Sequence, residues 1–83
     1  MPYVIPDYRH TLNFVVENMK AMDVQPDGRL NYVLFKFCKD TVEPSYNNYK
    51  NYIAELTECA EEIRRRFLSP YEDEKIKENG DVE

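Results

Sequence analysis

Residues 46–67 read YNNYKNYIAELTECAEEIRRRF, and this stretch decides the fold. Its apolar side chains recur at alternating intervals of three and four residues, as a row called here the seam: Tyr46, Tyr49, Ile53, Leu56, Ala60, Ile63 and Phe67. This heptad spacing is typical of a helix that packs against other helices as in a coiled coil. It predicts a long helix over about 46–68, with the seam as an oligomer interface.

Two shorter helices are predicted before the seam. Helical spacing over about 7–22 joins Tyr8, Leu12, Val15, Val16 and Met19, and over 29–41 it joins Leu30, Val33, Leu34, Phe37, Cys38 and Thr41. Residues 32–35 could also form a buried strand on propensity alone. Pro26 and Gly28 break the chain between the two helices, because Pro26 disfavours helix in the residue before it and Gly28 can adopt a positive φ. Ser45 is the expected N-cap of the long helix.

The C-terminal segment is predicted to form a fourth, short helix over 71–78. Ser69-Pro70 is expected to end the long helix, with Arg64, Arg65 and Arg66 offsetting the dipole of its last turn. Pro70 and the acids after it are typical of a new helix start. Asn79-Gly80 is expected to close that helix with a left-handed cap.

These elements predict an all-α fold for a single domain spanning 1–83: a small three-helix domain plus a short C-terminal helix. A helix of about 23 residues is roughly 34 Å long, which is more than so small a chain can cover. We therefore expect the chain to form a homo-oligomer through the long third helix.

Composition restricts the partners. The 83 residues carry a formal net charge of -5, which disfavours binding to nucleic acid or to an anionic membrane surface. The chain has only two glycines, too few for a glycine-rich nucleotide loop. Cys38 and Cys59 are expected to be buried, reduced thiols on apolar helix faces. No stretch resembles a signal peptide or a membrane span, so a cytoplasmic location is expected.

Three motifs carry a resemblance to a known family. They are Gly28-x-Leu30-Asn31-Tyr32, Glu58-Cys59-Ala60 followed by Glu62 and Arg65-Arg66, and Pro70-Tyr71-Glu72-Asp73-x-Lys75-Ile76-x-Glu78-Asn79-Gly80-Asp81-Val82. Together they resemble a family of short uncharacterised proteins of tailed bacteriophages and their bacterial hosts. The resemblance implies a phage or prophage setting, and hence the host cell cytoplasm. By analogy of context, small acidic proteins of that setting are often accessory factors, including antagonists of host defence.

Four acidic residues raise an enzymatic alternative. Glu61-Glu62 and Glu78-x-x-Asp81 are spaced as in all-α nucleotide pyrophosphohydrolases, which hold Mg²⁺ between facing helices. Gly80, however, should end the helix between Glu78 and Asp81 and keep their side chains off one face. Glu61 with Arg65, and Glu62 with Arg66, are also spaced as ordinary i,i+4 ion pairs. We therefore expect no catalytic residues, no metal and no cofactor, and keep the Mg²⁺-dependent enzyme as an alternative.

The arginines suggest a binding function. Arg64, Arg65 and Arg66 form a dense basic cluster in an acidic chain, and guanidiniums bind phosphate groups well. Tyr49, Tyr52 and Tyr71 could supply stacking surfaces for a base. We expect a non-enzymatic oligomer that antagonises host defence, by sequestering a nucleotide-type signal or by masking a host protein. A structural protein without a ligand is a further alternative.

Overall fold

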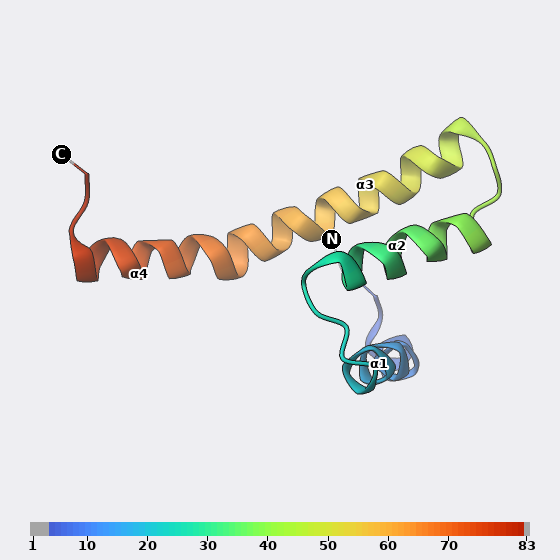
Figure 1. The fold of residues 1–83 in the computed structure, drawn as a ribbon, viewed down its shortest axis with the longest axis horizontal. Coiled ribbons are helices and arrows are strands. Elements are labelled where there is room, and N and C mark those ends of the chain that lie inside the picture. Colours follow the sequence, from blue (N-terminus) through green and yellow to red (C-terminus); the bar gives the residue numbers. More distant parts are fainter. Residues whose placement is uncertain (1–3, 83) are drawn as a thin grey trace. The chain divides into compact units, whose positions relative to one another are not determined.

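The computed structural model describes residues 4–82, and every regular element in that range is a helix (Figure 1). In chain order these are α1 (Pro6–Ala21), α2 (Gly28–Thr41), α3 (Tyr46–Ile63), the π-helical turn η1 (Arg64–Leu68) and α4 (Ser69–Asn79). The predicted all-α class is confirmed, and the strand considered for residues 32–35 is wrong, because they lie within α2.

The end of α1 forms a Schellman motif. The N–H of Asp23 donates to the carbonyl of Lys20 at 3.1 Å, and the N–H of Val24 donates to that of Met19 at 3.0 Å. Asp23 takes the left-handed position of this motif, with φ 56°. Aspartate tolerates that region better than most residues. The positive φ that Gly28 could adopt thus occurs at Asp23, five residues earlier, and Gly28 is the first residue of α2.

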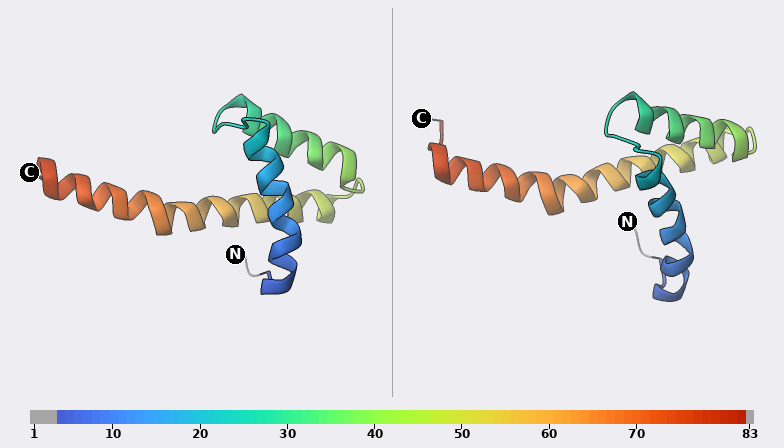
Figure 2. Two further views of the ribbon diagram at one scale, coloured as in Figure 1. Left: turned by 90° about the horizontal axis from the view of Figure 1, so that it is seen from below. Right: turned by 60° about the horizontal axis from the view of Figure 1, so that its bottom comes forward.

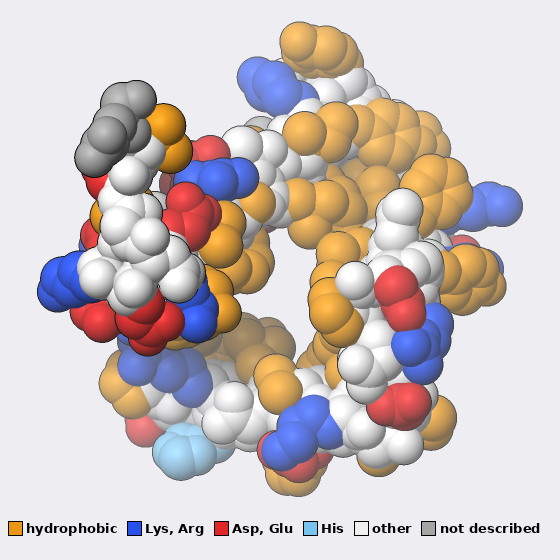
Figure 3. All heavy atoms as spheres, turned by 60° about the vertical axis from the view of Figure 1, so that its left-hand side comes forward, with side chains coloured by type: hydrophobic (Ala, Val, Ile, Leu, Met, Phe, Trp, Pro, Cys, Tyr) orange, Lys and Arg blue, Asp and Glu red, His pale blue; other side chains and the backbone are white. Residues whose placement is uncertain are grey.

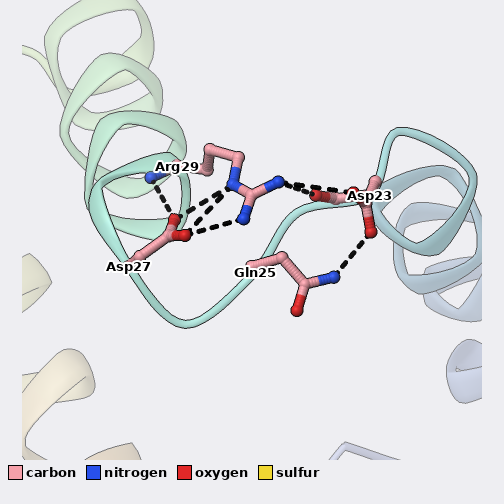
Figure 4. Close-up of polar contacts among 4 residues, drawn as sticks. All are labelled: Asp23, Gln25, Asp27 and Arg29. Carbon is pink, nitrogen blue, oxygen red and sulfur yellow. Dashed lines mark hydrogen bonds and ion pairs between the residues drawn. The ribbon is translucent and has the colours of Figure 1, made fainter.

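The loop between α1 and α2 is held by polar side chains (Figure 4). Asp27 caps α2, since its Oδ1 accepts the backbone N–H of Arg29 at 2.8 Å. The Arg29 guanidinium binds the same carboxylate, since its Nη2 donates to Oδ2 of Asp27 at 2.7 Å. Its Nη1 donates to the carbonyl of Asp23 at 3.2 Å. The Gln25 amide also donates to Asp23, at 2.6 Å. One arginine thus joins the end of one helix to the start of the next.

The start of α3 confirms the predicted cap. The Oγ of Ser45 accepts the backbone N–H of Asn48 at 3.0 Å, and its carbonyl accepts that of Tyr49 at 3.1 Å. The side-chain amide of Asn48 donates to the carbonyl of Glu43 at 3.0 Å, which ties the preceding turn to the helix. One of the N–H groups that a helix start leaves unpaired, that of Asn48, is satisfied in this way.

The chain does not break at Ser69-Pro70, so that prediction is wrong. Leu68 and Ser69 have helical dihedral angles, and α3, η1 and α4 follow one another without an intervening loop (Figures 1 and 2). In a regular α-helix the ring of Pro70 would collide with the carbonyl of Arg66. Here the residues before the proline form a wider turn, in which the Ser69 N–H donates to the carbonyl of Arg64. The wider turn accommodates the proline within one helical run, residues 46–79.

The helical run ends at Gly80, as predicted. Its N–H donates to the carbonyl of Ile76 at 2.8 Å, and its φ is 84°. Its ψ of 149° is extended, so the backbone is not in the left-handed helical conformation that was expected. An L-residue with a side chain rarely adopts this combination, which explains glycine at this position. Residues 1–3 at the N-terminus and residue 83 at the C-terminus lie outside the described residues.

The described residues fall into two parts. Residues 4–49 hold α1, α2 and the first turn of α3, and residues 50–82 hold the rest of the helical run. None of the described residues is buried. Figure 3 accordingly shows hydrophobic side chains, in orange, at the surface over several elements. The expected burial of the cysteines is wrong for the single chain, because Cys38 is partly exposed and Cys59 is exposed.

Candidate functional site

The arginine cluster coincides with the π-helical turn. Arg64, Arg65 and Arg66 form the first three residues of η1, and all are exposed. A π-helical turn is rare and often marks a functional position, because it changes the direction of side chains along a helix. The turn is explained locally by Pro70, which lies two residues after its end. The same proline therefore determines how the three guanidiniums are presented.

Glu62 is the acid bound to this cluster. Its Oε1 accepts a hydrogen bond from Nη2 of Arg65 at 2.8 Å, and its Oε2 lies 3.8 Å from Nη1 of Arg66. The side chain of Glu62 is 12% exposed, whereas those of Arg65 and Arg66 are 68% and 57% exposed. The hydrogen bond from Arg65, with the nearby charges, holds the pKa of Glu62 below its ordinary value, against the opposing effect of partial burial. The predicted Glu62–Arg66 pair is present, and Glu62 also binds Arg65.

Arg64 differs from its two neighbours. Within residues 4–82, its guanidinium makes no ion pair and no side-chain hydrogen bond. Five N–H donors are therefore available to a phosphate or carboxylate group, which can accept two of them side by side. Of the three predicted ligand-binding arginines, Arg64 is the one that the chain leaves ready for an anion.

Of the three candidate stacking tyrosines, the structure brings one near the arginines. Tyr71 follows η1 in the first turn of α4 and is 61% exposed, with Nζ of Lys75 5.5 Å from the centre of its ring. Tyr49 and Tyr52 lie in the N-terminal half of α3, more than three turns before Arg64. Within a single chain, they cannot stack on a ligand held by that arginine.

The carboxylates of the metal-dependent alternative are not brought together. Glu62 and Glu78 are sixteen positions apart in one helical run, so about 24 Å of helix axis separates them. Glu78 binds Lys75 at 3.1 Å, and Asp81 follows the helix end at Gly80. Within residues 4–82, no three His, Cys, Asp or Glu side chains gather in a metal-binding group. Glu61, Glu62, Glu78 and Asp81 do not form one site in the chain.

The seam is exposed along its length. Ile53 is 61% exposed, Leu56 38% and Ile63 50%, and Tyr46, Tyr49, Ala60 and Phe67 are exposed as well. The regular spacing stops at Ile63, because the wider η1 turn rotates Phe67 off the line of the preceding residues. Each large apolar side chain of the seam is thus more than a third exposed.

The Arg29 contacts were not predicted from the sequence. Arg29 lowers the pKa of Asp27 below its ordinary value, first by its side-chain hydrogen bond and then by its backbone N–H. A signal was present in Asp27-Gly28-Arg29, since aspartate is a preferred N-cap and its carboxylate can bind a nearby arginine. This cluster is satisfied within its own loop, so it stabilises the connection between α1 and α2 rather than offering a binding site.

Comparison with known proteins identifies the family of this chain. No described helix is long and apolar enough to cross a membrane. No curated protein and no solved structure matches the chain. One family model, described as domain of unknown function DUF6899, matches residues 1–82 and therefore nearly the whole sequence. The helices and the arginine turn described above are those of a member of the DUF6899 family, to which this chain belongs.

Proposed function

We propose that the chain is a non-enzymatic binding protein that works as an oligomer and takes an anionic, nucleotide-type ligand at Arg64–Arg66. The observation that carries the proposal is the absence of any buried residue among residues 4–82, together with the exposed seam. A chain with 42% hydrophobic residues and no interior of its own gains its core by association. In the assembly, the seam would contribute to that core.

The ligand part of the proposal is supported by Arg64. The chain is acidic overall, yet this guanidinium lies in a basic turn without an anionic partner among the described residues. Association of two copies supplies what one chain lacks: Tyr49 or Tyr52 of a second copy could lie beside the arginines and Tyr71 of the first. A nucleotide fits this combination, because its phosphates accept guanidinium hydrogen bonds and its base stacks on an aromatic ring.

The biological role follows from the phage setting that the sequence motifs imply. An oligomer that binds a nucleotide-type signal without converting it would lower the free concentration of that signal in the host cytoplasm. We propose this sequestration as the way in which the protein antagonises host defence. If no nucleotide binds, we propose instead that the exposed apolar face masks a host protein.

Calorimetry against a panel of cyclic and adenosine-diphosphate-ribose-derived nucleotides tests the ligand. Replacing Arg64 by alanine should weaken binding about tenfold or more, since a charge-assisted hydrogen bond contributes about 1.5–3 kcal/mol. Lys39→Ala, which removes a cation from α2, is the matched control and should bind as the wild type does. If no nucleotide binds more tightly than about 10 μM, roughly −7 kcal/mol, sequestration is contradicted. Conversion of any nucleotide in the presence of Mg²⁺ would contradict the non-enzymatic part.

A further inference from the structure

The charges on either side of Ser69 mirror one another with opposite sign. Counting outwards from Ser69, Arg66 corresponds to Glu72, Arg65 to Asp73 and Arg64 to Glu74. Phe67 corresponds in the same way to Tyr71. Three basic residues and an aromatic ring before the centre are thus matched by an aromatic ring and three acidic residues after it.

Helix ends would explain this order of charges if the chain broke at Ser69-Pro70. Cations stabilise the last turn of a helix and anions the first turn of the next. The structure removes that explanation, because Leu68 and Ser69 are helical and α3, η1 and α4 form one run. In an uninterrupted helix there is no exposed end for these charges to offset, so their arrangement needs another cause.

We propose that two copies of the chain pair antiparallel about Ser69, so that the arginines of each lie against the acidic residues of the other. The inference rests on the oligomeric part of the proposed function, and it adds a second contact to the seam, because in this pairing Ile53 and the residues before it extend past Glu83 of the second copy. A twofold contact requires a self-complementary surface. If a residue of the first copy contacts a second residue on the other copy, the same two residues are also in contact with the copies exchanged. Here the basic residues precede Ser69 and the acidic residues follow it at matching distances. Two such helices that run in opposite directions therefore place opposite charges against each other. A parallel pair in register would instead place Arg64–Arg66 against the same arginines of the second copy, which costs free energy.

The side chains at the centre of this contact are free to make it. Phe67 is 65% exposed and Tyr71 61%, and they are four residues apart on neighbouring turns. Antiparallel pairing places Phe67 of one copy opposite Tyr71 of the other, twice by symmetry, as an aromatic centre. Polar side chains surround that centre, as is usual for an interface core with a polar rim.

Three of the flanking charges, those of Arg64, Glu72 and Asp73, have no ion pair among the described residues. Within residues 4–82, neither Arg64 nor Glu72 makes an ion pair or a side-chain hydrogen bond. The two lie eight positions apart in one helical run, about 12 Å along its axis, which is too far for them to pair within a chain. In the antiparallel pair, Arg64 lies within one turn of Glu72 of the second copy. One carboxylate uses two guanidinium donors at most, so Arg64 keeps donors for the proposed ligand.

Charge reversal tests the contact directly. Sedimentation velocity on Arg64→Glu and on Glu74→Arg, which are counterparts about Ser69, should each show a dissociation constant raised about tenfold or more, because like charges then face each other twice. Combining both changes in one chain restores opposite charges across the contact and should return the constant to near the wild-type value. An equimolar mixture of the two single variants should form mixed dimers for the same reason. Lys39→Glu and Glu55→Arg, which change the net charge equally at other exposed positions, are the controls.

Each outcome decides the matter. Weakening by both single reversals with recovery in the double variant supports the pairing, and helicity measured by circular dichroism shows that the variants remain folded. If the assembly is insensitive to the reversals, or if the double variant does not recover, the pairing about Ser69 is wrong while the oligomer stands. In that case the face around Phe67 and Tyr71 is left for a different partner. A wild-type chain that remains monomeric would overturn both this contact and the proposed function.

Discussion

Replacing Ile53 by alanine tests whether the seam is an interface. Ile53 is 61% exposed in the single chain, and full burial of an isoleucine side chain contributes about 1.5–3 kcal/mol. The fraction that association can still bury is therefore worth about 1–2 kcal/mol per copy. Two copies across a twofold contact double this to about 2–4 kcal/mol, and each 1.4 kcal/mol is tenfold in affinity. We expect a dissociation constant raised about thirtyfold to several hundredfold.

Sedimentation equilibrium over a range of concentrations measures this change. Asn51→Ala is the matched control, because Asn51 is exposed on α3 away from the seam, and it should associate as the wild type does. Ile53→Asp should have a larger effect, since association would then bury an unpaired charge. If Ile53→Ala and Asn51→Ala had the same dissociation constant as the wild type, the inference from the heptad spacing to an interface would be refuted.

Two further predictions concern the fold. Ser45→Ala removes the acceptor of the Asn48 N–H and should lower the free energy of unfolding by about 1 kcal/mol. Ser45→Asp keeps a capping oxygen and should leave that free energy near the wild-type value. Thermal unfolding followed by circular dichroism compares the two variants. Acid should destabilise the fold through Asp27 and Glu62, whose pKa values lie below their ordinary values of 3.8 and 4.5. A carboxyl with a lowered pKa stabilises the fold fully above its ordinary pKa, and that stabilisation is lost as the pH falls through the lowered value. The unfolding temperature should therefore fall below about pH 4.5, and less so in Asp27→Asn, which cannot titrate; a midpoint that does not change between pH 6 and about pH 3 would contradict these contacts.

The helices themselves could be predicted because their signals are local. Apolar residues at helical spacing located the starts of α1, α2 and α3, and the ends of α1 and α2, to within one residue. The cap at Ser45 was also correct, because a serine before a helical pattern directly satisfies an N–H of the first turn. Gly80 could be identified as a stop because its missing side chain permits a positive φ.

The errors arose where two local preferences compete. Pro70 normally disfavours a helix before it, because its ring collides with the carbonyl of Arg66. The wider η1 turn removes that collision, and the helix propensities of single residues do not indicate that such a turn can form. At the end of α1, both Asp23 and Gly28 can take a positive φ, and the hydrogen bonds of the Schellman motif decide for Asp23. Sequence spacing had no means of weighing those bonds.

The residues of the candidate site could be identified from the sequence, but their arrangement in space could not. The density of Arg64–Arg66 is visible in the sequence, but its placement on a π-helical turn follows from that unforeseen accommodation of the proline. The sharing of Glu62 between two arginines, which leaves Arg64 without a partner among residues 4–82, depends on side-chain directions in that turn. Likewise, the distance between the proposed metal ligands became clear only once the helix was known to continue through Ser69.

The native mass tests the central claim most directly. Light scattering coupled to size-exclusion chromatography, at micromolar concentration and neutral pH, should return at least twice the 9.9 kDa of one chain. The proposed assembly would remove the exposed apolar side chains of the seam from water. A stable, cooperatively unfolding species with the mass of a single chain would contradict the account.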